Sequence, residues 1–368
     1  PGVLDACFVC LPGSAAARLG LAANIEELKP PKDLWIGRVS QLRPVAQGCP
    51  TASLSLLDDV EGHCSGIAVL LHGSVGIAKV TVRLMRMLAA KGILVLAPDS
   101  MATSKGRYRE VRTEPLTADM ETDYWADNFF YASPASGDLN YSSSAQGVLN
   151  DPEWYKRTFE AVYQERSRDL QTVLKALPEF AKASGVFLVG CSEGAAAIVR
   201  FDERLCGVPV RGRILTSFCC EYCYFHQAAE AARFAGSLEV PTVTVIGHFD
   251  PFFGASGSIA QQVLADPRGW GSATFSGNAF GAMVEQGMRT GLSCVVDSDK
   301  HDLTQTHNRF LQRLLGLFLQ NPESCHALGA SWCSGEGFTM EVSKRTDHCL
   351  LITEGLAQGS EYLGRAAS

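Results

Sequence analysis

Short runs of apolar residues alternate with amphipathic, helix-like segments along most of this chain of 368 residues. The apolar runs are Gly66–Leu71, Ile93–Ala97, 186–189, 213–218, 241–246 and 292–296. Runs of this length are typical of strands that are buried on both faces of a sheet. The segments between and after them, including 80–90, 159–177 and 303–319, carry apolar residues at helical spacing. This alternation predicts an α/β fold whose mostly parallel sheet is doubly wound, with helices on both faces.

Changes in composition divide the chain into three parts. Residues 1–60 form an N-terminal extension that contributes edge strands, one of them expected at 52–57. Residues 61–320 form the α/β domain, which is interrupted at about 101–155 by a polar, aromatic-rich insertion that resembles a lid. Residues 321–368 form a small C-terminal appendage, in which "FTMEV" and "CLLIT" predict a hairpin.

The charge and hydropathy of the chain exclude two classes of partner. The net charge is -7 and no run of Lys and Arg stands out, which argues against binding to nucleic acid. No uninterrupted apolar stretch is long enough for a membrane span. The N-terminus also lacks the basic-then-apolar pattern of a secretory signal. We therefore expect an intracellular protein, cytoplasmic or, if a targeting peptide has been removed, organellar.

Thirteen cysteines are scattered along the chain without the spacing of a disulfide framework. Two C-x-x-C pairs occur, Cys7 with Cys10 and Cys220 with Cys223. Neither pair has a second pair nearby to complete a four-thiolate zinc site. We interpret these residues as buried, reduced thiols rather than metal ligands.

Polar residues follow most of the predicted strands. They are His72-Gly73-Ser74, the stretch 190–194, Glu221, Asp250 and His301. In a doubly wound sheet, ligands and catalytic groups lie at the carboxyl ends of the strands. These residues are therefore the candidates for chemistry.

The stretch "GCSEG" at 190–194 matches the pattern G-x-S-x-G between a predicted strand and a predicted helix. In that pattern the central residue lies on a tight, strained turn that raises its side chain above the sheet. The central residue here is Ser192, so its Oγ is the candidate nucleophile. Cys191 is a flanking residue, and we expect its thiol to point toward the sheet.

A serine hydroxyl needs a base to become a nucleophile, and the base needs an orienting acid. His301 follows the last strand of the domain and Asp250 follows the strand before it. The order Ser192, Asp250, His301 is the one expected for a triad on this kind of sheet. The backbone N–H groups of Glu193 and Ser74 are the candidate oxyanion donors.

Other assignments remain open at this point. Glu221 is an alternative acid, because it follows an earlier strand, and His307 is an alternative base. His72 fits the turn that forms the oxyanion hole better than it fits a base. The residues proposed to line a substrate pocket are His72, Trp125 and Phe129. The last two belong to the insertion, which is either a lid over the pocket or a loop that buries itself.

These segments resemble the α/β-hydrolases and, within them, the dienelactone hydrolase family. The resemblance covers about 60–320 and is carried by "VLLHGSVG", "GILVLAPDSMA", "RSRDLQTVLKALPEF", "GVFLVGCSEGAAA", "PTVTVIGHFDPFF" and "DKHDLTQTHNRFLQRLL". It implies an eight-stranded, mostly parallel sheet, hydrolysis of ester or lactone bonds, and no metal or organic cofactor. It assigns Ser192 as nucleophile, Asp250 as acid and His301 as base. The family itself carries cysteine at the centre of this strand-to-helix turn, called the nucleophile elbow, so Ser192 is a departure from the family pattern.

The sequence therefore predicts a serine hydrolase that acts on a small-molecule ester, thioester or lactone through an acyl-enzyme intermediate. A catalytically inactive member of the fold, serving as a binding or assembly subunit, is the alternative. A serine peptidase is a third possibility, but it would require a carboxylate cluster or a large extra domain, and neither is evident.

Overall fold

The computed structural model describes the chain in segments. They are 3–21, 25–26, 33–39, 42, 54–74, 76–100, 152–221, 233–265, 275–324, 338–342 and 347–353. The chain divides into two compact units. Unit 1 comprises Pro1–Tyr141, Gln164–Gly190 and Glu203–Val210, and unit 2 comprises Ser142–Tyr163, Cys191–Asp202 and Arg211–Ser368.

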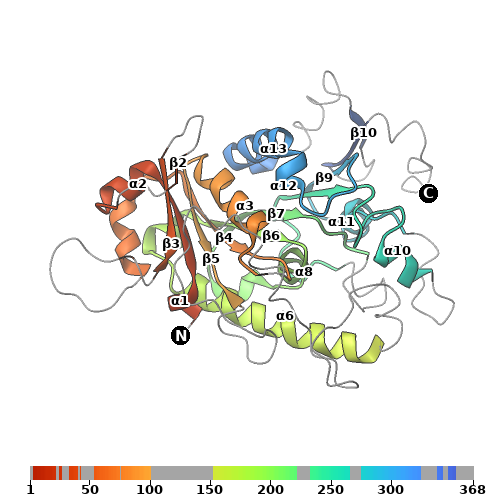
Figure 1. Ribbon diagram of the computed structural model, residues 1–368, viewed down its shortest axis with the longest axis horizontal. Helices are drawn as coiled ribbons and strands as arrows, with labels where there is room; N and C mark the ends of the chain where they lie inside the picture. Colours follow the sequence, from red (N-terminus) through yellow and green to blue (C-terminus); the bar gives the residue numbers. More distant parts are fainter. Residues whose placement is uncertain are drawn as a thin grey trace. The chain divides into compact units, whose positions relative to one another are not determined.

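The sheet of unit 1 has the strand order β2-β3-β1-β5-β4-β6 (Figure 1). Its strands are β1 (Phe8–Pro12), β2 (Ile25–Glu26), β3 (Asp33–Arg38), β4 (Gly66–Leu71), β5 (Ile93–Ala97) and β6 (Val186–Cys191). β4 pairs in parallel with both β5 and β6, whereas β1 pairs antiparallel with β3 and β5. Because β4 lies between β5 and β6, the chain winds away from β4 first on one side and then on the other. Binding sites of open α/β sheets lie at such a switch point.

Apolar sequence explains the core of unit 1. Every residue of β4, β5 and β6 is buried, as expected for parallel strands covered on both faces. Helix α3 (Lys79–Ala89) buries Val82, Met85 and Leu88, which recur at helical spacing. Helix α3 ends before Gly92, whose φ of 82° lies in the left-handed region that favours glycine.

Shorter helices complete unit 1. They are α1 (Val3–Ala6), α2 (Gly13–Arg18), η2 (Leu54–Val60), α7 (Glu179–Ser184) and η5 (Glu203–Cys206). The strand expected at 52–57 is wrong over its described part, because a 3₁₀ helix begins at Leu54. The apolar residues Leu54, Leu57 and Val60 of this segment recur every three residues and are all buried. That is the spacing of a 3₁₀ helix rather than of a strand.

The sheet of unit 2 has the order β10-β11-β9-β8-β7. Its strands are β7 (Val210–Thr216), β8 (Thr242–Gly247), β9 (Thr290–Val296), β10 (Phe338–Val342) and β11 (Asp347–Thr353). β7, β8, β9 and β11 pair in parallel, and β10 is antiparallel to β11. The predicted C-terminal hairpin therefore forms, and β11 in addition pairs with β9. The prediction of an α/β protein with mostly parallel strands is confirmed.

The helices of unit 2 connect and follow its strands. They are α8 (Glu193–Val199), α10 (Ile259–Leu264), α11 (Phe280–Glu285), α12 (Leu303–Thr306), α13 (Asn308–Gln320) and η6 (Pro322–Ser324), and the long α6 (Pro152–Lys175) begins in this unit. The single helix expected at 303–319 is divided at His307, whose φ of -117° and ψ of 32° are not helical, although its backbone N–H still donates to the carbonyl of Leu303 at 2.9 Å. Within the described residues, no helix has the length and hydropathy needed to cross a membrane.

Candidate active site

Ser192 occupies the turn between β6 and α8. Its φ of 55° and ψ of -121° are an unusual conformation for a residue with a side chain. Such a conformation costs about 1 to 3 kcal/mol and persists where the surrounding structure enforces it. The backbone N–H of Ser192 donates to the carbonyl of Thr216 at 2.9 Å, and its own carbonyl accepts from Ala196 at 3.0 Å. The strained strand-to-helix turn predicted from "GCSEG" is therefore present.

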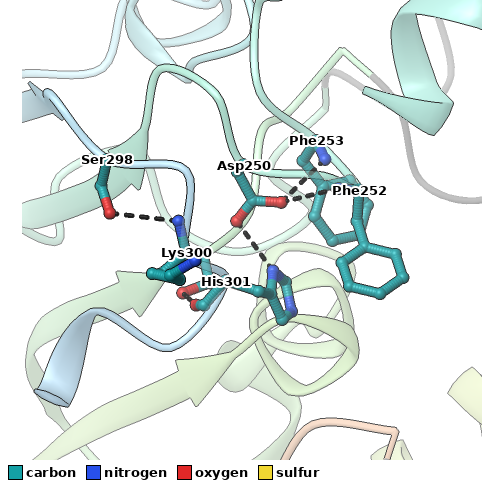
Figure 2. Close-up of polar contacts among 7 residues, drawn as sticks. Asp250, Phe252, Phe253, Ser298, Lys300 and His301 are labelled. Atoms are coloured by element: carbon teal, nitrogen blue, oxygen red, sulfur yellow. Dashed lines mark hydrogen bonds and ion pairs between the residues drawn. The ribbon is translucent and has the colours of Figure 1, made fainter. Parts of the chain in front are cut away.

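Asp250 and His301 lie together in the same unit as Ser192. Asp250 follows β8 and is completely buried. Its Oδ2 accepts a hydrogen bond from His301 Nδ1 at 2.7 Å. Its Oδ1 accepts from the backbone N–H groups of Phe252 at 2.8 Å and Phe253 at 3.1 Å (Figure 2). Because a carboxylate only accepts, the imidazole carries a proton on Nδ1, and in the neutral form of the ring Nε2 is an acceptor.

Close backbone packing holds the loop that carries Asp250. A Cβ on Gly254 would lie 2.4 Å from Asp250 N and 2.6 Å from the carbonyl oxygen of His248, so only glycine fits there. The N–H of Phe249 donates to the carbonyl of Ser298 at 3.0 Å. This hydrogen bond holds the loop that carries Asp250, called the acid loop below, against the loop after β9, which carries His301.

Two phenylalanines of the acid loop flank the imidazole of His301. The ring of Phe252 meets it edge-on, with centroids 4.7 Å apart, as Figure 2 shows. The ring of Phe253 lies 5.9 Å from it and is fully buried. The side chain of His301 remains 25% exposed, so the imidazole is supported on its Asp250 side and accessible elsewhere.

The hydrogen bonds of Ser192 among the described residues are made by its backbone. Its Oγ is not bonded to His301 Nε2, which lies in the same unit. Hydrogen bonds between nucleophile and base are often long in ligand-free enzymes and tighten when substrate binds. The structure thus brings Asp250 and His301 into contact and gives Ser192 the elbow conformation.

The alternative acid and base have other partners. The carboxylate of Glu221 accepts hydrogen bonds from Ser276 N, Ser276 Oγ and Gly277 N at 2.7 to 3.0 Å. Burial raises the pKa of Glu221 to about 7, against the lowering effect of these bonds. His307 lies between α12 and α13, with its Nδ1 3.0 Å from Thr306 Oγ1. The contact of Asp250 with His301 therefore favours this pair over Glu221 or His307.

The thiol of Cys191 is unsuited to nucleophilic attack. Cys191 is only 2% exposed. Burial raises the pKa of its thiol to about 12, so the reactive thiolate is scarce at neutral pH. The side chains of Thr216 and Ser217 contact this thiol. The burial of Cys191 is what is expected of a flanking thiol that points toward the sheet.

The remaining predicted residues fall in different places. Glu193 begins α8 directly after Ser192. Ser74 belongs to unit 1, and its role as an oxyanion donor stays a prediction. The ring of His72 is buried, with Nε2 accepting from Ser100 N at 3.2 Å and Nδ1 2.7 Å from the carbonyl of Gly73. This arrangement favours a role in the turn over contact with a substrate.

Arg166 also holds the turn after β4. Its fully buried guanidinium donates from Nη2 to the carbonyl of Gly73 at 3.2 Å.

Trp125 and Phe129 lie outside the described residues. Cys7 and Cys10 are buried in or beside β1, whereas Cys223 lies outside the described residues. Where the chain is described, no cluster of three His, Cys, Asp or Glu residues is arranged to hold a metal ion.

Sequence reasoning missed Ser217. The apolar run predicted a strand through residue 218, but β7 ends at Thr216, and Ser217 adopts a φ of 56°. Its Oγ donates to the backbone carbonyl of His301 at 2.5 Å. A serine directly after a strand was the one available signal, and it does not specify a partner 84 residues away.

No protein-family model and no curated protein matches this chain. Solved structures are similar to it at low identity. The protein TT1662 of Thermus thermophilus is 15% identical, with 77% of this chain and 93% of that chain covered and a TM-score of 0.37. A monoglyceride lipase of Saccharomyces cerevisiae is 10% identical, with 71% and 88% covered and a TM-score of 0.35.

A putative dienelactone hydrolase of Klebsiella pneumoniae is 12% identical, with 70% of this chain and 89% of that chain covered and a TM-score of 0.34. Matches this remote say nothing about a substrate. The fold is that of the α/β-hydrolases: an antiparallel β1 beside parallel β5, β4 and β6, and a strained serine between β6 and α8.

Proposed function

We propose that this protein is a serine hydrolase that cleaves an ester, thioester or lactone bond in a small molecule. The observation that carries the proposal is the buried Asp250 bonded to His301 Nδ1 at 2.7 Å, in the same unit as a strained Ser192. This pairing leaves Nε2 of the imidazole free to accept a proton. Nucleophilic catalysis requires a hydroxyl group and a histidine that is oriented as its base, and Ser192 and His301 are proposed to supply them.

The reaction proceeds in two halves. Ser192 Oγ attacks the carbonyl carbon while His301 Nε2 takes the hydroxyl proton. The oxyanion that forms accepts a hydrogen bond from the backbone N–H of Glu193. Collapse of this intermediate breaks the bond to the alcohol or thiol, which leaves with the proton from His301. An acyl group then remains on Ser192.

Water completes the cycle. His301 takes a proton from the water as its oxygen attacks the acyl carbon, and the second tetrahedral intermediate releases the carboxylic acid. The proton returns to Ser192 Oγ. Asp250 stays ionised throughout and stabilises the imidazolium that forms in both halves. The two backbone N–H groups that it accepts support its charge.

A fluorophosphonate probe tests this proposal directly. We expect it to label Ser192 in the wild type, and Ser192→Ala to lose both the labelling and the hydrolysis of short p-nitrophenyl esters. Cys191→Ala should keep most of the hydrolysis, because the Cys191 thiol is buried and protonated. Loss of activity in the Cys191 variant alone would show that the nucleophile is wrongly assigned.

A non-catalytic binding or assembly role is the second candidate. The observation that favours it is that, within the described residues, Ser192 Oγ is not hydrogen-bonded to His301. This role predicts no labelling of well-folded wild-type protein by the probe. Labelling of Ser192 would exclude it.

A further inference from the structure

Two residues other than glycine have a positive φ in the described part of the chain, and both are serines of unit 2. One is Ser192, at 55°, and the other is Ser217, at 56°. Glycine adopts this conformation without the penalty of a Cβ. A serine that is held there therefore costs stability relative to glycine.

The segment Thr216–Ser217 contacts both halves of the proposed catalytic machinery. The carbonyl of Thr216 accepts the backbone N–H of Ser192 at 2.9 Å. The N–H of Ser217 donates to Val245 in β8 at 2.8 Å. The Oγ of Ser217 donates to the carbonyl of His301 at 2.5 Å. Two adjacent residues thus connect the elbow, the sheet and the histidine.

His301 lies in a connection of six residues between β9 and α12, which runs from Asp297 to Asp302. Lys300 N donates to Ser298 Oγ at 3.2 Å on one side of it, and the Asp302 side chain caps α12 on the other. The imidazole is held at Nδ1 by Asp250. Ser217 holds the backbone of the same residue. The direction of Nε2 depends on both, because the ring turns about bonds that start at that backbone.

We propose that Ser217 is a positioning residue, whose hydroxyl fixes the His301 carbonyl so that Nε2 is directed at Ser192. This inference rests on the proposed function. A shift of about 1 Å in a catalytic group costs on the order of 100-fold in rate. We expect Ser217→Ala and Ser217→Gly to lower kcat by about 10- to 100-fold with little change in KM.

The glycine variant separates positioning from folding. Ser217→Gly removes the strain at a φ of 56°, so we expect its melting temperature to equal or exceed that of the wild type. Its kcat should nevertheless fall, because the hydroxyl is gone. Ser217→Thr keeps a hydroxyl but adds a branch that this conformation disfavours, so it should melt lower and yet be more active than Ser217→Gly. A purely structural role predicts that activity follows stability instead.

Ser293→Ala is the matched control. Ser293 is a fully buried serine of β9, and its Oγ accepts a hydrogen bond from Thr244 Oγ1 of β8 at 3.0 Å. It belongs to the same unit and has no part in the proposed chemistry. The control should lower the melting temperature and leave kcat at the wild-type value.

A proton NMR measurement reads the arrangement without turnover. The Nδ1 proton of His301, shared with Asp250, should resonate far downfield in the wild type and in Ser293→Ala, and should move in the Ser217 variants. Fluorophosphonate labelling of the same proteins separates the possible failures. An unlabelled wild type overturns the proposed function. If the wild type is labelled, and Ser217→Ala and Ser217→Gly are labelled by the probe at the wild-type rate with the Nδ1 resonance unmoved, then only the assignment of Ser217 is wrong.

Discussion

Replacing Asp250 by asparagine should separate the orientation of His301 from the folding of the acid loop. The Oδ1 of Asp250 accepts two backbone N–H groups, from Phe252 at 2.8 Å and Phe253 at 3.1 Å, and Oδ2 accepts from His301 at 2.7 Å. Asparagine can keep the first two bonds with its own carbonyl oxygen. Its amide N–H₂ then faces His301 Nδ1, which must become the acceptor.

The magnitude follows from the tautomer. With Nδ1 accepting, the imidazole proton lies on Nε2, which can then no longer take the proton of Ser192. In serine proteases this exchange of tautomer lowers kcat by about 10⁴-fold. We therefore expect Asp250→Asn to lose about 10³- to 10⁴-fold in kcat, which corresponds to about 4 to 5.5 kcal/mol of barrier. The free energy of unfolding should change by only about 1 kcal/mol, because the two backbone bonds persist.

Asp250→Ala provides the contrast. It removes the acceptor of two N–H groups in a completely buried site, and each buried donor left unpaired costs about 1 to 3 kcal/mol. The alanine variant should lose both activity and stability. Initial rates with a p-nitrophenyl ester and urea unfolding of each variant measure the two quantities separately.

Asp299→Asn controls for the loss of a carboxylate near His301. The side chain of Asp299 is 70% exposed and pairs with Lys300, so its replacement should leave kcat unchanged. If Asp250→Asn keeps more than about a tenth of the wild-type kcat, the tautomer of His301 is not set by Asp250.

Three further outcomes are expected. Burial raises the pKa of Glu221 from 4.5 to about 7, so the folded state holds this proton more tightly than the unfolded state. The contribution of Glu221 to the free energy of unfolding should therefore fall by about 3 kcal/mol as the pH rises from 4.5 to about 7. Urea unfolding at a series of pH values should show this fall in the wild type and not in Glu221→Gln. Gly254→Ala should melt lower and lose activity, since its Cβ would lie 2.4 Å from Asp250 N, whereas Gly281→Ala, with open space at its Cβ, should do neither. The Cys191 thiol, with its pKa raised to about 12, should resist iodoacetamide at pH 8 until the protein unfolds, and mass spectrometry of the peptide checks this.

Local patterns made much of the site predictable. A strand, a glycine-flanked serine and a helix follow one another within 186–199, and that order alone specifies the turn at Ser192. Asp250 and His301 were predictable because each comes soon after a buried strand. The hydrogen bond between them, across 51 residues, follows from parallel strands that end at the same edge of a sheet.

The parts that could not be predicted depend on backbone conformation and distant contacts. The positive φ of Ser217 cannot be recognised from the sequence, because the apolar run continues to Phe218. The break at His307 lies inside a segment whose apolar spacing is helical on both sides. The 3₁₀ helix at Leu54–Val60, by contrast, could have been recognised, because Leu54, Leu57 and Val60 recur every three residues.

The parallel pairing of β11 with β9 has a consequence for how the protein is made. β9 leads directly to the connection that carries His301, and six of its residues pair with Asp347–Ile352. During synthesis, Asp347–Ile352 leave the ribosome after every proposed catalytic residue. Until they arrive, β9 presents a bare row of N–H and C=O groups, the kind of edge that recruits strands from other chains. A shortened gene ending at residue 320 should therefore yield aggregated protein even though it encodes Ser192, Asp250 and His301 in full.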